Sequence, residues 1–127
     1  MPGGPYPSQT GAVVTYTTPA GTRADQFDFT ADGVTQRALV PWTAGPGTAA
    51  VWCLHGLGDD HTMVTDGLFH TYGMTDACLD DGFVVLGTGT DPQRNWGNQA
   101  GRDTHVAVWE WSLGLWPLAP GPCLYGI

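Results

Sequence analysis

The stretch AAVWCLHGLGDDH, residues 49–61, decides how the rest of the chain is interpreted. An apolar run ends abruptly in His55-Gly56 and passes into a polar loop that contains glycine. This pattern predicts a buried strand over Ala50–Leu54 that delivers a loop to the rim of a sheet. Because α/β proteins place their chemistry at such rims, this loop is the first candidate for a functional site.

The composition indicates one globular domain with many turns. The chain has 127 residues, of which 19 are Gly and 10 are Pro, and its net charge is -8 with no lysine among its four basic residues. A chain without a clustered cationic face is a poor partner for nucleic acid or an anionic membrane. No apolar stretch reaches membrane-spanning length, and the first residues lack the pattern of a secretory signal. We therefore expect a soluble chain, and the sequence leaves its compartment open.

The segment before the central strand divides into an arm and a hairpin. Residues 1–22 are rich in Pro, Gly, Ser and Thr, and only Ala12–Tyr16 resembles a strand, so we predict an extended or flexible N-terminal arm. Two β-favouring runs then flank Asp32-Gly33, which predicts a β-hairpin. The folded domain is expected to cover residues 23–127.

The segment after the central strand predicts a parallel unit. Residues 75–82 resemble the last turns of a helix that ends at Gly82, and the apolar run 83–86 resembles a strand. A helix is predicted over about 99–116 from its apolar spacing, and a third parallel strand over 122–126. The predicted class is therefore α/β, a β-hairpin followed by parallel βαβαβ.

This order of elements resembles the N-terminal half of an α/β-hydrolase, the superfamily of serine esterases, lipases and peptidases. The resemblance covers residues 27–127. It rests on a leading hairpin, a strand that ends in His55-Gly56-Leu57, an Asn-Trp-Gly-Asn loop over 95–98, and a strand that reaches Tyr125-Gly126. It implies a three-layer sandwich that is incomplete at its C-terminal side.

The resemblance also implies roles for the loop. In the family this loop provides a backbone N–H to the oxyanion hole, a role that falls to Leu57, with Gly56 shaping the loop and His55 supporting it as a structural residue. Gly126-Ile127 matches only the first two positions of the Gly-x-Ser-x-Gly nucleophile elbow, and the family keeps its Ser, acid and His at or after the elbow. The resemblance therefore assigns no catalytic Ser, acid or base in this chain. For the same reason the triad base is none of its four histidines: His55, His61, His70 and His105.

A metal site is the rival interpretation of the same loop. Asp60-His61, with His55 nearby, is superficially similar to the HxHxDH metal loop of the metallo-β-lactamase group. Aligned on Asp60-His61, however, the two upstream histidine positions are occupied by Gly56 and Gly58, and zinc needs three or four converging ligands. No metal and no cofactor are expected. Asp60 is more simply a loop residue that caps the next helix.

The three cysteines, Cys53, Cys78 and Cys123, have no CxxC spacing and predict neither a disulfide framework nor a thiolate metal site. Cys53 and Cys123 would lie on neighbouring parallel strands, where disulfide geometry is poorly met. We therefore expect free, mostly buried thiols, and no cysteine nucleophile.

Asn95 and Trp96 follow the second parallel strand, so they would face the same rim as the His55 loop and could border a substrate. Packing of Trp96 under the following helix explains them equally well.

Two functions remain open. The chain is either the front half of a hydrolase of esters or amides, inactive alone and completed by a C-terminal half or second chain, or a non-catalytic structural or interaction protein that retains the half-fold in a homo- or hetero-oligomer. The last predicted strand favours a partner, because an exposed strand edge invites pairing.

Overall fold

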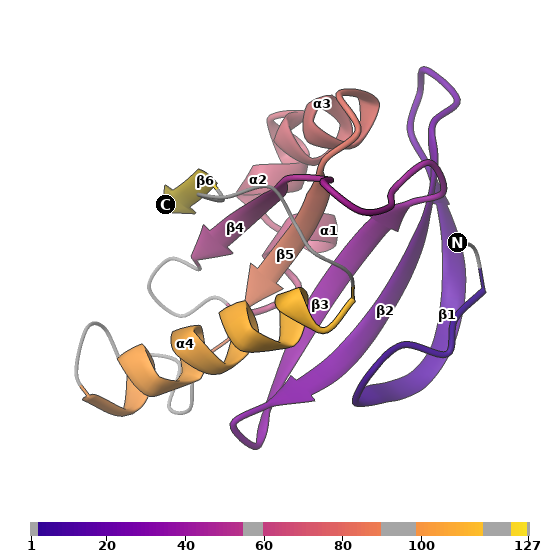
Figure 1. Cartoon of the computed structure of the whole chain (residues 1–127). Coiled ribbons are helices and arrows are strands. Elements are labelled where there is room, and N and C mark those ends of the chain that lie inside the picture. The colour runs from indigo at the N-terminus through magenta and orange to yellow at the C-terminus, as the bar shows by residue number, and fades with distance from the viewer. Residues whose placement is uncertain (1–2, 55–59, 90–98, 116–122, 127) are drawn as a thin grey trace.

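The computed structural model describes residues 3–54, 60–89, 99–115 and 123–126, and the account below is restricted to them (Figure 1). One mixed sheet of six strands runs in the order β1-β2-β3-β5-β4-β6. The strands are β1 Gln9–Thr17, β2 Arg23–Ala31, β3 Val34–Pro41, β4 Ala50–Leu54, β5 Val84–Thr88 and β6 Cys123–Gly126. The helices are α1 Met63–Asp66, α2 Leu68–Thr71, α3 Met74–Asp80 and α4 Gln99–Leu113, and none of them is long and apolar enough to cross a membrane.

The predicted hairpin is β2 and β3. These strands pair antiparallel from Ala24↔Pro41 to Ala31↔Val34, and the two residues between them, Asp32 and Gly33, both have positive φ, 53° and 71°. Two positive φ values in a two-residue loop match the twist of the flanking strands, and Asp-Gly is a sequence that accepts them. The turn also anchors α4, because Thr104 Oγ1 donates to Asp32 Oδ2 at 3.0 Å.

The N-terminal segment departs from the predicted arm. It is extended over Gln9–Thr17, but there it is hydrogen-bonded to β2 as the strand β1 rather than free of the sheet. Distant partners hold it: Tyr16 Oη donates to Asp76 on α3 at 2.6 Å, and ahead of β1 the Tyr6 hydroxyl donates to the buried carboxylate of Asp25 at 2.7 Å. The domain boundary at residue 23 stays a prediction.

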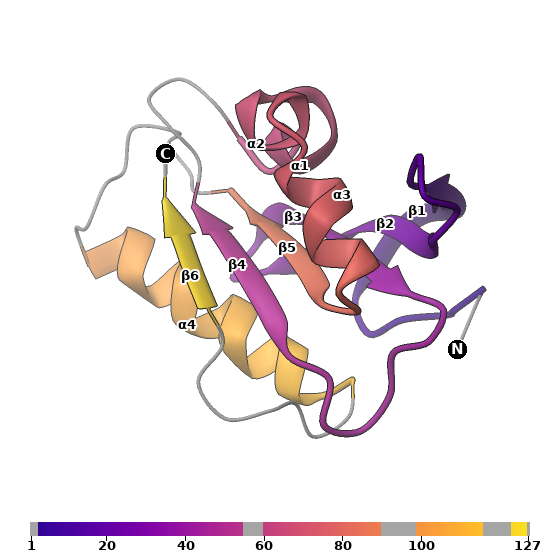
Figure 2. The same ribbon diagram turned by 90° about the horizontal axis from the view of Figure 1, so that it is seen from above.

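The parallel half of the sheet agrees with the predicted class. β5 and β6 lie on opposite sides of β4, and both are parallel to it. The connection from β4 to β5 and the connection from β5 to β6 run across the sheet in opposite directions. Because such crossover connections share one handedness, their helices lie on opposite faces of the sheet. α1–α3, between β4 and β5, cover one face, and α4, between β5 and β6, covers the other (Figure 2). The result is three layers, and the predicted α/β class is confirmed.

Each face of the sheet carries its own apolar cluster. On the α4 face, Trp111 stacks on Phe29 with ring centroids 3.6 Å apart, and its indole N–H donates to the carbonyl of Pro7 at 2.6 Å. On the other face, Met63 and Phe69 are fully buried against the sheet. The helices are therefore held by burial of large side chains, the dominant favourable contribution to folding.

Candidate functional site

The carboxyl ends of the three parallel strands meet at one edge of the sheet. Leu54, the last residue of β4, is paired with Thr88 at the end of β5 and with Gly126 at the end of β6. Segments that follow these strands therefore leave from the same edge and at the same level. Open α/β sheets bind ligands at this edge, so we call it the rim.

The residues predicted to act at this rim lie outside the described residues. His55, Gly56 and Leu57 follow β4, and Asn95 and Trp96 fall between β5 and α4. Their assigned roles remain predictions. The structure does describe how the chain enters and leaves these two stretches, which are called here the first rim segment (55–59) and the second rim segment (90–98).

The exit of the first rim segment is fixed by Asp60. Its Oδ1 accepts hydrogen bonds from the backbone N–H of Thr62 at 2.9 Å and from the Thr62 hydroxyl at 2.6 Å. Such a side-chain turn satisfies a backbone donor ahead of a helix. Asp60 thus caps the approach to α1, although Thr62 rather than Asp60 is the N-cap residue.

His61 then lies beside an ion pair that joins β2 and β3. Arg37 Nε on β3 donates to Asp28 Oδ1 on β2 at 2.8 Å, and its Nη1 donates to Thr65 Oγ1 on α1 at 2.6 Å. His61 Nε2 lies 3.7 Å from Asp28 Oδ2, longer than a hydrogen bond. These contacts tie the chain after the first rim segment to β2 and β3.

The charges of Asp28 and Arg37 are stable at neutral pH. Burial alone would raise the pKa of Asp28, but the interactions with His61 and Arg37 outweigh it and lower this pKa to about 2. The pKa of Arg37 is raised, chiefly by its hydrogen bond to Asp28. A carboxylate and a guanidinium that both stay ionised act as a clamp and not as proton-transfer groups.

The entrance of the second rim segment is clamped by a buried glutamine. Gln36 is fully buried on β3, and its side chain both accepts from the N–H of Gly89 at 2.6 Å and donates to the carbonyl of Gly89 at 3.0 Å. A Cβ on Gly89 would lie 2.9 Å from the carbonyl oxygen of Thr35, closer than such contacts occur. The sequence interpretation missed Gln36 and Arg37. The signals for them were Gly87, which pairs with Arg37, and Gly89 directly after β5, because glycine marks close approach of another backbone.

Neither of the two cysteine side chains that the structure describes, Cys53 and Cys78, has a catalytic environment. Cys53 is fully buried and Cys78 is partly buried, and both are free, as predicted. Burial first, and the neighbouring Cys78 second, raise the pKa of the Cys53 thiol, so its nucleophilic thiolate is disfavoured. The side chain of Cys123 lies outside the described residues. Among the described residues, no group of three His, Cys, Asp or Glu side chains could hold a metal ion.

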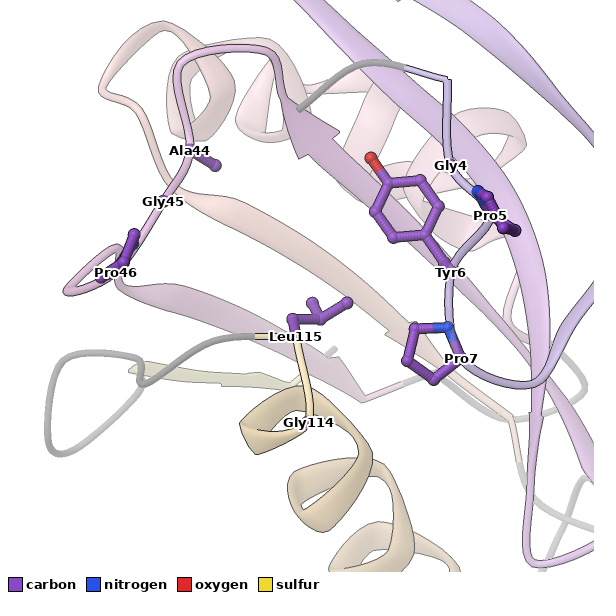
Figure 3. A pocket seen from close by; sticks show the side chains of 9 residues that line it. All are labelled: Gly4, Pro5, Tyr6, Pro7, Ala44, Gly45, Pro46, Gly114 and Leu115. Carbon is purple, nitrogen blue, oxygen red and sulfur yellow. The ribbon is translucent and has the colours of Figure 1, made fainter.

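A pocket of about 340 Å³ lies away from the rim. It is bordered by the segment Gly4–Pro7, by Ala44–Pro46 ahead of β4, and by Gly114 and Leu115 after α4, which places it at the amino ends of the parallel strands (Figure 3). Among the described residues that line it, the one titratable side chain is that of Tyr6, whose pKa is raised by burial and by the hydrogen bond to Asp25.

Comparison with family models found no match, and neither did comparison with curated proteins. Two solved structures from Staphylococcus aureus are similar. One is FphF, a fluorophosphonate-binding serine hydrolase in a substrate-bound form, with TM-score 0.56, 15% identity, and coverage of 93% of this chain and 47% of FphF. The other is the S-formylglutathione hydrolase FrmB, with TM-score 0.54, 15% identity, and coverage of 97% of this chain and 51% of FrmB. The chain thus spans about half the length of the structures it matches. At this identity the similarity concerns the fold, and the chain has a partial α/β-hydrolase fold.

Proposed function

We propose that this chain supplies the oxyanion loop of a serine hydrolase that cleaves an ester or amide through an acyl-enzyme. The observation that supports it best is the register at the rim, where Leu54 is level with both Thr88 and Gly126. In this proposal the His55-Gly56-Leu57 loop, which follows Leu54 in the sequence, begins level with the end of β6, where a Gly-x-Ser-x-Gly elbow would start. The similar fold of two serine hydrolases is consistent with this assignment.

In this proposal the chemistry of the chain is in its backbone. The N–H of Leu57 donates to the oxygen that becomes negative when the acyl carbon is attacked, Gly56 allows close approach, and His55 supports the loop. A preorganised donor of this kind contributes on the order of 3 kcal/mol to transition-state stabilisation. Asn95 and Trp96 border the substrate from the second rim segment.

The nucleophile, acid and base then belong to a second segment or polypeptide that joins the sheet beside β6. In the described part of the chain β6 pairs on one side only, with β4, so its other edge can accept a further strand. The chain by itself is expected to be inactive. Reading the nucleotides after the Ile127 codon tests whether Ser-x-Gly completes the elbow, in frame or shifted.

The functional test is hydrolysis of a short-chain nitrophenyl ester by the chain alone and mixed with the polypeptide encoded downstream. Leu57→Pro removes the donor N–H, and the matched control Leu57→Ala keeps it. The mixture should be active, Leu57→Pro should lower its kcat about 10²-fold or more, and Leu57→Ala should retain most of it. Labelling of the isolated chain by a fluorophosphonate would contradict the proposal, because it would show a nucleophile within these 127 residues.

The second candidate is a non-catalytic interaction protein. It is favoured by the outward side of α4, where Val106 and Leu113, two turns apart, are both largely exposed. Glu110 is exposed between them, so the apolar surface is small, and this candidate has the weaker support of the two. An inactive mixture that nevertheless forms a stable complex, with unchanged affinity in Leu57→Pro, would favour this candidate over the hydrolase.

A further inference from the structure

A second pocket, of about 540 Å³, lies at the end of the sheet opposite the rim. It is bordered by the turn between β1 and β2, by the residues that follow β3, and by the end of α3. Among the described residues that line it, Arg23 is the one cation and Asp80 the one anion. The nearby strand β5 starts at Val84 and ends at the rim, so the length of a strand separates this pocket from the rim.

The guanidinium of Arg23 is held on the ring of Trp42. Its central carbon lies 5.3 Å from the ring centroid, which is within the range of a cation–π interaction. Trp42 is itself fixed, because its indole N–H donates to the buried carboxylate of Asp25 at 2.9 Å. Its backbone N–H also donates to the carbonyl of Arg23 at 3.0 Å. Stacking occupies the face of a guanidinium and leaves the N–H groups at its edge able to donate to a carboxylate.

The carboxylate of Asp80 is held on the turn between β1 and β2. Asp80 is the last residue of α3, and its Oδ1 accepts from the hydroxyl of the buried Thr18 at 2.7 Å. Hydrogen bonds from Thr22 and Thr18 lower the pKa of this carboxyl, so Asp80 is ionised at neutral pH. Both donors are neutral, so they position the carboxylate without cancelling its charge.

The two charges of the pocket are not neutralised by the part of the chain that the structure describes. Within that part the ion pairs involve Arg37 and His61, and neither Arg23 nor Asp80 takes part in one. A simple anion at Arg23 would be repelled by Asp80 and by the net charge of -8, and a simple cation at Asp80 would be repelled by Arg23. A ligand that carries both charges meets an opposite charge at each end.

We propose that this pocket binds a small zwitterion, with its carboxylate on the Arg23 guanidinium and its ammonium group on the Asp80 carboxylate. Straight-chain amino carboxylic acids are the simplest members of this class. Their methylene groups would lie beside Trp42 and Gly82, which also line the pocket. Because Arg23 and Asp80 are exposed, each ionic contact is weak, and we expect binding in the millimolar range. The proposal is independent of the proposed hydrolase function.

The test is an NMR titration of the whole chain with straight-chain amino acids, from glycine to ε-aminocaproate. The series varies the separation of the two charges. At least one member should shift the indole N–H signal of Trp42 and the backbone amide signals of Thr22 and Gly82, with a Kd of about 1–10 mM. The amine and the carboxylate of the same chain length carry one charge each, and they should bind at least about fivefold more weakly.

Charge variants test the two assigned contacts. Asp80→Asn removes the negative charge but keeps an oxygen that can accept from Thr18, and Arg23→Gln removes the positive charge. Asp81→Asn is the matched control, because Asp81 is the next residue, is exposed and does not line the pocket. Asp80→Asn and Arg23→Gln should each raise the Kd at least about fivefold, and Asp81→Asn should change it less than about twofold.

Three results would each overturn the proposal. The first is the absence of a saturable shift for every amino acid of the series. The second is equal affinity for the zwitterion and its singly charged analogues. The third is an effect of Asp81→Asn as large as that of Asp80→Asn, because it would show that only the overall charge of the chain matters.

Discussion

Replacing Gly87 by alanine tests how the chain returns to the sheet after the first rim segment. Gly87 lies within β5, and a Cβ added there would collide with the carbonyl oxygen of His61 and come within 2.8 Å of Val64 Cγ2. A backbone carbonyl cannot rotate away as a side chain can, so either the His61 segment or β5 must shift. Overpacking of this kind costs about 1–3 kcal/mol, offset by up to about 1 kcal/mol from the less flexible unfolded chain. We expect a net loss of about 2 kcal/mol in the free energy of unfolding.

Urea unfolding followed by tryptophan fluorescence measures this loss. With a slope of about 2 kcal/mol per M, the midpoint of Gly87→Ala should fall by about 1 M. Gly45→Ala is the matched control, since its Cβ would meet nothing within 4 Å, and its midpoint should stay or rise slightly. Equal midpoints for the two variants would refute the reasoning, because they would mean that His61 does not pack against β5.

Three further predictions concern the clamps around the rim and the N-terminal segment. The pKa of Asp28 is lowered from 3.8 to about 2, so ionised Asp28 contributes up to about 2 kcal/mol to the free energy of unfolding above pH 4. This contribution should be lost as the pH falls to about 2, and unfolding measured over an acid titration should show the loss. In Asp28→Asn the same pH dependence should be absent. Gln36→Leu should cost about 2–4 kcal/mol in urea unfolding, because it leaves the N–H and carbonyl of Gly89 without their partners; a loss below about 1 kcal/mol would contradict the clamp. Tyr6→Phe removes the hydroxyl bonded to Asp25 and should cost about 1–2 kcal/mol, with faster proteolysis ahead of β1; unchanged proteolysis would argue against this anchor.

Local patterns in the sequence predicted the central elements well. The strand Ala50–Leu54 has the predicted bounds. A short apolar run with polar, glycine-containing stretches on both sides favours a buried strand that starts and ends with the run. The Asp32-Gly33 turn was equally clear, because few residue pairs accept two positive φ values. The short helices α1 and α2 were not predicted, since four residues are too few to show a helical period.

The features that the sequence did not reveal depend on contacts between distant residues. Pairing of β1 is supported by Tyr16 and Asp76, which are sixty positions apart. The ionic clamp and the Gln36–Gly89 pair likewise join different strands, and nothing in either local sequence specifies the partner. The rim itself was predictable, because parallel strands deliver their loops to one edge. The side-chain contacts that hold the chain beside those loops, at Arg37 and Gln36, were not predictable from the sequence.

The order of strands in the sheet has a consequence for folding. β1, β2 and β3 are consecutive in both sequence and space, so their hairpins close short loops at little entropic cost. β6 instead pairs with β4 across a long stretch of sequence that contains α1–α4 and β5. This stretch has to fold before the two strands can meet. Because folding slows as contacts become less local, we expect the meander at the N-terminal end to form early and β6 to join the sheet last. During synthesis on the ribosome, the meander would emerge and fold while the strand that completes the rim is still being made.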